Sequence, residues 1–153
     1  MKIFVDTNAF LFMLRNAKDA DKIANILDGD KNEIFTSIAV LNELKYKLLW
    51  LEATDRLHTN KKYAVLSYIK KNDNFREEVL IKYLEFYYNL VRKCHVYPLT
   101  GDNELQTIGI MMKYGLLPTD AYIIATMQSQ NLQDILTDDS DFEKIANINV
   151  IKI

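Results

Sequence analysis

The chain has 153 residues, of which 49% are hydrophobic and 26% are charged. This composition is typical of a globular protein and excludes a disordered chain, and the length suits one domain over residues 1–153. A net charge of −2 provides no overall attraction for nucleic acid, although locally basic surface can coexist with an acidic cleft. The single cysteine, Cys94, excludes an internal disulfide framework.

The N-terminal segment is apolar but does not have the pattern of a signal peptide, because Asp6 and Asn8 interrupt it. No apolar stretch approaches the ~20 residues that a helix needs to span a bilayer. We therefore expect a cytoplasmic protein with no membrane association.

Strands alternate with helices from the N-terminus onward. In chain order, the first third predicts a strand over Lys2–Val5, a helix through Leu14, a helix over Asp21–Leu27 and a strand over Glu33–Thr36. A long helix follows Ser37, whose side chain can cap its first turn. A leucine stripe with helical spacing predicts the buried face of this helix, and its members are Leu41, Leu44, Leu48 and Leu51.

The remainder of the chain continues the alternation. It predicts two helices between Asn60 and Arg92, a strand over His95–Leu99, a helix over Asp102–Tyr114, an apolar helix from Pro118, and strands over Asp134–Thr137 and Asn149–Lys152. Apolar residues of the helix that ends near Arg92 form too wide a band for one buried face, so we expect a homodimer contact there. The alternation predicts a three-layer α/β/α fold around a parallel sheet of about five short strands.

Four acids lie where predicted strands end or helices begin, namely Asp6, Glu43, Asp120 and Asp139. Ligands of open parallel sheets bind outside the carboxyl ends of the strands, so all four acids can point into one crevice. Carboxylates cannot be packed together in the ionised form without cations. Oxygen-only ligands suit Mg²⁺ or Mn²⁺, and the sequence therefore predicts a site for one of these ions.

Each acid also has an ordinary structural explanation when it is taken alone. A helix cap, a favourable helix dipole, a solvated helix position and an Asx-turn would account for the four. The combination favours a site, because Asp6 follows a wholly apolar strand and Asp120 begins an apolar helix, where an unpaired charge is costly.

These motifs, in this order and nearly spanning the chain, resemble a PIN domain: KIFVDTN, LNEL, TDAYIIA and TDDSDF. In size and layout the chain is most similar to the VapC-type toxins of that family. The resemblance implies an acidic quartet of Asp6, Glu43, Asp120 and Asp139, with Asp141 as a possible fifth acid and Asn8 and Thr137 as polar helpers. Asp138 competes with Asp139, but Asp139 fits the Thr-x-Asp spacing better.

The resemblance further implies an Mg²⁺- or Mn²⁺-dependent endoribonuclease that is the toxin of a type II toxin–antitoxin pair, with a small antitoxin as its protein partner. Candidate RNA-binding residues are Lys45, Lys47, Lys61 and Lys62, which are interleaved with aromatic residues able to stack on unpaired bases. Alternatively, these lysines only solvate helix faces, and the aromatic residues belong to the core or to a dimer contact.

Other functions are consistent with part of the pattern. A PIN nuclease that processes ribosomal RNA, or a non-catalytic PIN-like scaffold that binds RNA, would share these motifs. A phosphotransfer protein of the receiver or haloacid-dehalogenase type would also place an acid after the first strand. The haloacid dehalogenases need a second Asp where this chain has Asn8, and no paired acid precedes Asp6 as receivers require.

Overall fold

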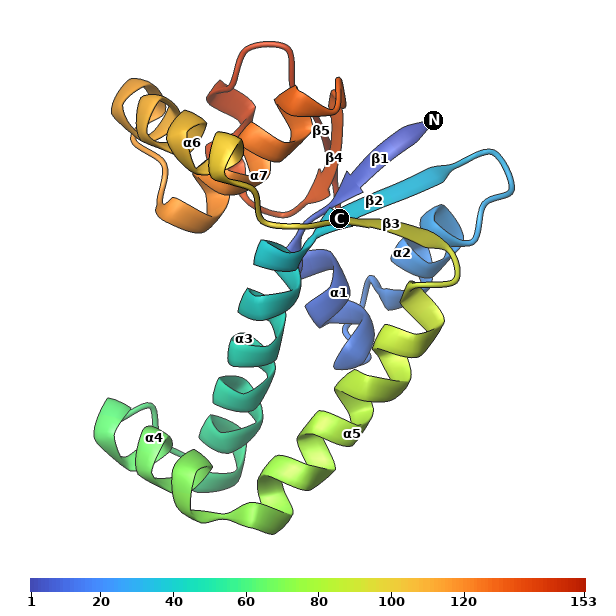
Figure 1. Ribbon diagram of the computed structural model, residues 1–153. Helices are drawn as coiled ribbons and strands as arrows, with labels where there is room; N and C mark the ends of the chain where they lie inside the picture. Colours follow the sequence, from blue (N-terminus) through green and yellow to red (C-terminus); the bar gives the residue numbers. More distant parts are fainter.

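A five-stranded sheet runs through the centre of the molecule, and every strand is parallel to its neighbours in the order β3-β2-β1-β4-β5 (Figure 1). The computed structural model describes residues 1–153. The strands are β1 (Lys2–Val5), β2 (Glu33–Ser37), β3 (Cys94–Tyr97), β4 (Asp134–Thr137) and β5 (Asn149–Lys152). The predicted parallel sheet is thereby confirmed.

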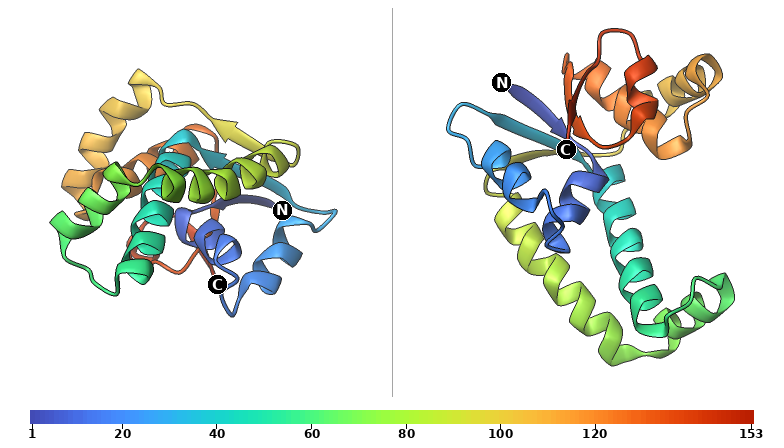
Figure 2. Two further views of the ribbon diagram at one scale, coloured as in Figure 1. Left: turned by 90° about the horizontal axis from the view of Figure 1, so that it is seen from below. Right: turned by 180° about the vertical axis from the view of Figure 1, so that it is seen from behind.

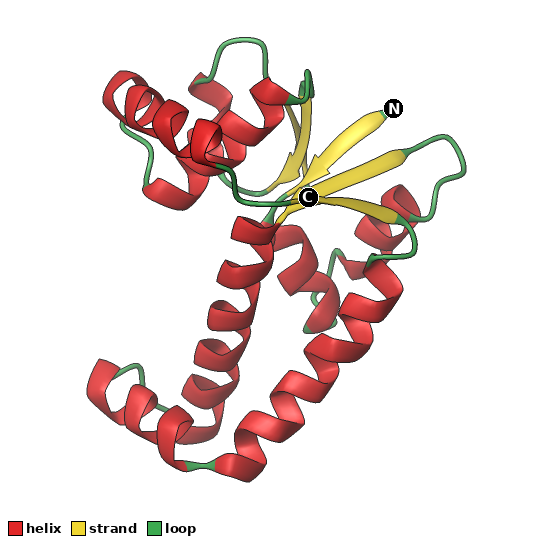
Figure 3. Ribbon diagram, viewed as in Figure 1, coloured by secondary structure: helices red, strands yellow, loops and turns green.

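Helices cover both faces of this sheet, which confirms the predicted three-layer architecture (Figures 2 and 3). They are α1 (Thr7–Leu14), α2 (Ala20–Leu27), α3 (Ile38–Leu57), α4 (Lys62–Lys71), α5 (Asp73–Leu90), α6 (Gly101–Tyr114) and α7 (Pro118–Ser129), with a short 3-10 helix η1 (Ser140–Lys144). Helices α6 and α7 lie on one face, and α1, α2 and α5 lie on the other (Figure 1). None of the helices combines the length and the hydropathy that crossing a bilayer requires.

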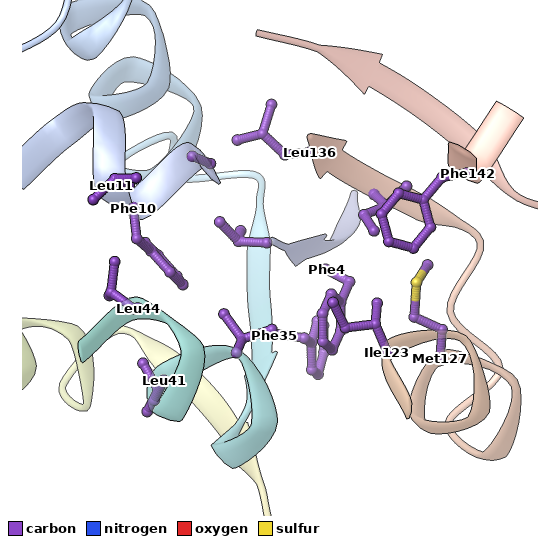
Figure 4. Packing of buried hydrophobic residues seen from close by; sticks show 14 of the residues in the cluster. Phe4, Phe10, Leu11, Phe35, Leu41, Leu44, Ile123, Met127, Leu136 and Phe142 are labelled. Atoms are coloured by element: carbon purple, nitrogen blue, oxygen red, sulfur yellow. The ribbon is translucent and has the colours of Figure 1, made fainter. Parts of the chain in front are cut away.

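The hydrophobic core lies on both faces of the sheet around β1 and β4, in which every residue after the first is buried. On one face Phe10 and Leu44 pack toward the sheet, and on the other Ile123 and Phe142 do so (Figure 4). Three of the four leucines in the α3 stripe are fully buried and Leu51 is half-buried. Because both layers are packed against the same strands, the loops at the strand ends are held in place.

The third strand differs from its predicted bounds of His95–Leu99. It begins at Cys94, which pairs with Ile34 in the parallel register, and it ends at Tyr97. Pro98 follows and has no backbone N–H to donate to a ladder, so the strand stops there. The 3-10 helix η1 was not predicted, because a single turn is too short to show a periodic pattern.

Candidate functional site

Asp6 lies at the centre of the candidate site, directly after β1 and at the N-cap of α1. Its side chain is buried, with only 4% of the residue exposed. One carboxylate oxygen accepts a hydrogen bond from the Thr7 backbone N–H at 2.6 Å, and the other accepts from the Thr137 hydroxyl at 2.7 Å. Burial raises the pKa of Asp6, and these two hydrogen bonds act in the opposite direction. The carboxylate is therefore held in one orientation.

Glu43 reaches the same place from α3 and is held by two neighbours. The Thr7 hydroxyl donates to one of its carboxylate oxygens at 2.9 Å, and the Lys47 ammonium lies 2.9 Å from the other. Lys47 is one helical turn further along α3, a spacing that brings opposite charges together. Its Nζ also donates to Asn8 Oδ1 at 3.2 Å. These contacts join α3 to α1 beside Asp6.

Asp120 approaches from the first turn of α7, on the other face of the sheet. Burial and the negative charges of nearby acids raise its pKa to about 7. Those acids are Asp6, Asp139 and Glu43. The predicted quartet is therefore gathered closely enough for its charges to interact, although the four residues come from four different segments.

Asp139 is positioned by the turn that follows β4. Its backbone N–H donates to the Thr137 hydroxyl at 3.0 Å, so this one hydroxyl links Asp139 to Asp6. Its carboxylate accepts from the Asp141 backbone N–H at 2.8 Å and caps η1. Asp138 is exposed and is not among the charges that act on Asp120. The geometry therefore favours Asp139 over Asp138 as the fourth acid.

Not all of the other predicted site residues lie beside the four acids. Asn8 and Thr137 lie at the site, as expected. Asp141 is exposed and pairs with Lys144 at 3.1 Å, and it is not among the charges that act on Asp120. Its role as a fifth acid stays a prediction.

The four predicted RNA-binding lysines do not form one cluster. Lys47 is at the site, whereas the Lys45 ammonium lies 5.8 Å from the centre of the Tyr83 ring on α5. Lys61 and Lys62 are exposed beyond the far end of α3, about 20 Å along the helix from Glu43 at its ordinary rise. Contact between these three lysines and RNA stays a prediction.

Sequence reasoning gave no role to Thr7, although its backbone and hydroxyl contact two of the acids. The available signal was a hydroxyl residue directly after Asp6, at the first position of a helix. The pairing of Lys47 with Glu43 was also visible as a spacing of four residues on one helix.

The donor set of this site consists of carboxylate and hydroxyl oxygens with excess negative charge, which is the chemistry that hard divalent cations prefer. The residues fit such an ion, since burial and mutual repulsion disfavour the ionised form of Asp120. As the side chains stand, no three acidic, histidine or cysteine side chains are close enough to hold one ion together. Binding therefore requires the acids to move closer to one another.

The fold and the acidic site together define the class of protein. The sequence model of the PIN domain family matches residues 3–148, nearly the whole chain. The chain therefore belongs to the PIN domain family, which confirms the resemblance seen in the sequence motifs.

Individual relatives can also be named. Ribonuclease VapC2 of Methanocaldococcus jannaschii is 25% identical over 152 residues, covering 99% of this chain and 94% of that protein. Ribonuclease VapC6 of the same organism is 26% identical, covering 98% of this chain and 96% of that protein. Among solved structures, VapBC2 from Rickettsia felis bound to a promoter DNA fragment has a TM-score of 0.62 at 16% identity, covering 99% of this chain and 98% of that chain.

The structure of Mycobacterium tuberculosis VapC20, described as a sarcin–ricin loop cleaving toxin, has a TM-score of 0.57 at 17% identity. It covers 96% of this chain and 98% of that chain. These structural similarities confirm the fold.

Proposed function

We propose that this protein is a divalent-metal-dependent endoribonuclease, the VapC-type toxin of a type II toxin–antitoxin pair. The observation that carries the proposal is the convergence of four carboxylates at the carboxyl edge of the sheet, where burial and the charges of the neighbouring acids raise the pKa of Asp120 to about 7. The names of the two Methanocaldococcus relatives, both ribonucleases, support the same reaction.

The residues that would hold the metal are Asp6, Glu43, Asp120 and Asp139. When bound, Mg²⁺ or Mn²⁺ would lower the pKa of a coordinated water and offset the charge that develops on the scissile phosphate. Cleavage is expected to leave a 5′-phosphate and a 3′-hydroxyl.

The chain's own side chains would prepare the site for this reaction. Thr137 orients Asp6 and holds the turn that carries Asp139, and Thr7 orients Glu43, so these hydrogen bonds oppose the repulsion that would otherwise separate the acids. Lys47 has three donors and makes two contacts in the structure, to Glu43 and Asn8, both at the edge of the acidic group, so one donor is left for a ligand. An RNA phosphate bound by this ammonium would therefore lie beside the acids.

The proposal is tested by Mn²⁺-dependent cleavage of a panel of RNAs, including ribosomal RNA. The wild type should cleave, and Asp6→Asn should lose at least about 100-fold in rate, because it removes a charged metal ligand. Asp138→Asn is the matched control, since it removes a neighbouring but exposed carboxylate, and its rate should remain that of the wild type. Equal cleavage by wild type and Asp6→Asn would reveal a contaminating nuclease. No cleavage by either would favour the non-catalytic scaffold.

An antitoxin is proposed as the protein partner, because solved structures with this fold include VapBC complexes. A groove of about 610 Å³ between α3 and α6 includes Glu43, and Ile108 and Leu99 on its wall are more than half exposed. A small antitoxin that covers this groove would close the acidic site. Co-expression with the product of the neighbouring gene should yield a complex that lacks nuclease activity, and a complex that cleaves as fast as the free protein would contradict this assignment.

A homodimer through α5 is also proposed. This helix exposes an apolar strip formed by Leu80, Ile81, Leu84 and Tyr88. In sedimentation experiments, Leu84→Glu should convert a dimeric wild type to a monomer, because it would bury an unpaired charge in the contact. A wild type that sediments as a monomer at every concentration would exclude this dimer.

A further inference from the structure

A hollow of about 400 Å³ lies between α1 and α3, next to the acidic site. Its lining residues are Asn8, Leu11, Tyr46, Lys47, Trp50 and Leu51. The volume falls within the ~300–1,000 Å³ typical of small-molecule sites. Lys47 and Asn8 belong both to this hollow and to the hydrogen-bonded group around Glu43, so the hollow adjoins the acidic site.

Two aromatic side chains distinguish this hollow from an ordinary surface depression. Tyr46 and Trp50 are one turn apart on α3, and their ring centres are 6.1 Å apart with 29° between the planes. Tyr46 is 55% exposed, although a large aromatic ring normally buries more of its surface. Leu11, which is buried, supplies an apolar wall. Trp50 is partly buried against the core, so Tyr46 supplies the exposed ring of the pair. Accessible aromatic rings beside a cation are the features on which unpaired bases stack.

We propose that this hollow binds one unpaired nucleobase of the RNA strand, stacked against Tyr46 and Trp50, while Lys47 contacts the adjoining phosphate. The proposal rests on the ribonuclease function and deepens it by assigning a base subsite next to the cut. Lys47 supports this occupant, because its ammonium lies 2.9 Å from Glu43 and also lines the hollow. If one phosphate of an RNA strand reaches the acids, the neighbouring base of that RNA would therefore lie against Tyr46 and Trp50.

Trp50 is the only tryptophan of the chain, so its fluorescence reports directly on the hollow. We would use Asp6→Asn, which should bind RNA without cutting it, and titrate it with a short unpaired oligonucleotide. The titration would then be repeated with versions of this oligonucleotide that each carry one abasic nucleotide, at a different position in each version. The intact strand should quench Trp50, and a single abasic position should abolish the quenching. That position should adjoin the bond that the wild type cleaves.

Binding should also depend on the exposed tyrosine. Tyr46→Ala is expected to weaken RNA binding by about 5- to 140-fold, the range found for loss of one base stack, and Tyr46→Phe should retain binding. Because Tyr46 is half exposed, its replacement should not prevent folding. Tyr63→Ala on α4 is the matched control, since Tyr63 is 89% exposed and remote from the hollow, and its affinity should be unchanged.

Other outcomes would overturn the inference. If the wild type cleaves RNA but Tyr46→Ala and every abasic strand bind normally, the base subsite is wrong and the ribonuclease function stands. Trp50 emission that changes with protein concentration in the absence of RNA would instead assign the hollow to a contact between copies of this chain. If quenching of Trp50 fluorescence requires one particular base but the wild type cleaves no RNA, the base subsite is supported and the nuclease function is rejected.

Discussion

Two threonine residues link the acids of the site. The Thr137 hydroxyl contacts both Asp6 and Asp139, whereas Thr7 contacts Asp6 through its backbone N–H and Glu43 through its hydroxyl. A hydroxyl can donate and accept at once, so it can join two neighbouring groups that would otherwise repel or remain unpaired. Asp120 has no such hydroxyl partner, and burial together with the charges of the neighbouring acids raises its pKa to about 7.

The repulsion at Asp120 should appear as a pH dependence of stability in the metal-free protein. Its pKa is 3.8 in the unfolded chain and about 7 in the folded one. Below 3.8 the group is neutral in both states, and as the pH rises toward 7 the unfolded chain loses its proton first, so the folded state loses stability. Relative to Asp120→Asn, the wild type should therefore lose on the order of 2 kcal/mol between pH 5 and pH 8.

Urea denaturation in the presence of a chelator measures this difference. Asp138→Asn is the control, because Asp138 is exposed and its replacement should change stability by less than about 0.5 kcal/mol at either pH. A gap between wild type and Asp120→Asn that is the same at pH 5 and pH 8 would contradict the proposed burial of this charge.

Among the elements, α3 contributes most to the site. It carries Glu43 and Lys47 beside the acids, and Tyr46 and Trp50 at the hollow. The helix begins directly after β2, without a loop, so its first turn is tied to the edge of the sheet. Ser37 caps this turn, with its hydroxyl accepting from the Val40 backbone N–H at 3.4 Å.

Removing this cap should destabilise the protein. We expect Ser37→Ala to lower the free energy of unfolding by about 1 kcal/mol, since the Val40 N–H is buried and would lose its partner. Asp19→Ala is the comparison, because Asp19 stands at the N-cap of α2 but its side chain makes no capping hydrogen bond. Chemical denaturation of both variants checks the expectation, and equal losses would show that the Ser37 hydroxyl contributes nothing specific.

At the scale of the whole molecule, the site depends on the order of the strands in the sheet, which reverses direction at β1. The chain runs from β1 to β2 and β3 on one side and only later to β4 and β5 on the other. This order places a crevice between β1 and β4, where loops leave in opposite directions. Helices from both faces then bring Glu43 and Asp120 to the same edge.

Metal binding should consequently stabilise the whole fold. Mn²⁺ at about 100 times its dissociation constant should add about 2.7 kcal/mol, because it binds only the folded arrangement. For a chain of this length, that corresponds to a rise in Tm of roughly 5–10 °C. Calorimetry with and without a chelator measures the rise, which Asp6→Asn should abolish. An equal rise in that variant would place the ion elsewhere.

Local patterns in the sequence were sufficient for much of the fold and for part of the site. Short apolar runs, the α3 leucine stripe and Gly115 after α6 mark elements that depend mainly on neighbouring residues. The start of β3 at Cys94 could not be read in the same way, because it depends on pairing with β2, whereas Pro98 is a local signal for its end. The four lysines also looked like one group along the chain, but the length of α3 separates them.

By itself, the sequence determined which residues are acidic and that each stands at the start of a helix or the end of a strand. Their types and positions are properties of short segments, and hydrophobic periodicity reveals such segments. Only the tertiary structure decided how the acids are held, namely that Thr7 joins two of them and that Asp141 pairs with Lys144. Contacts between residues far apart in the chain depend on the order of strands and the packing of both helical layers, which no local pattern encodes.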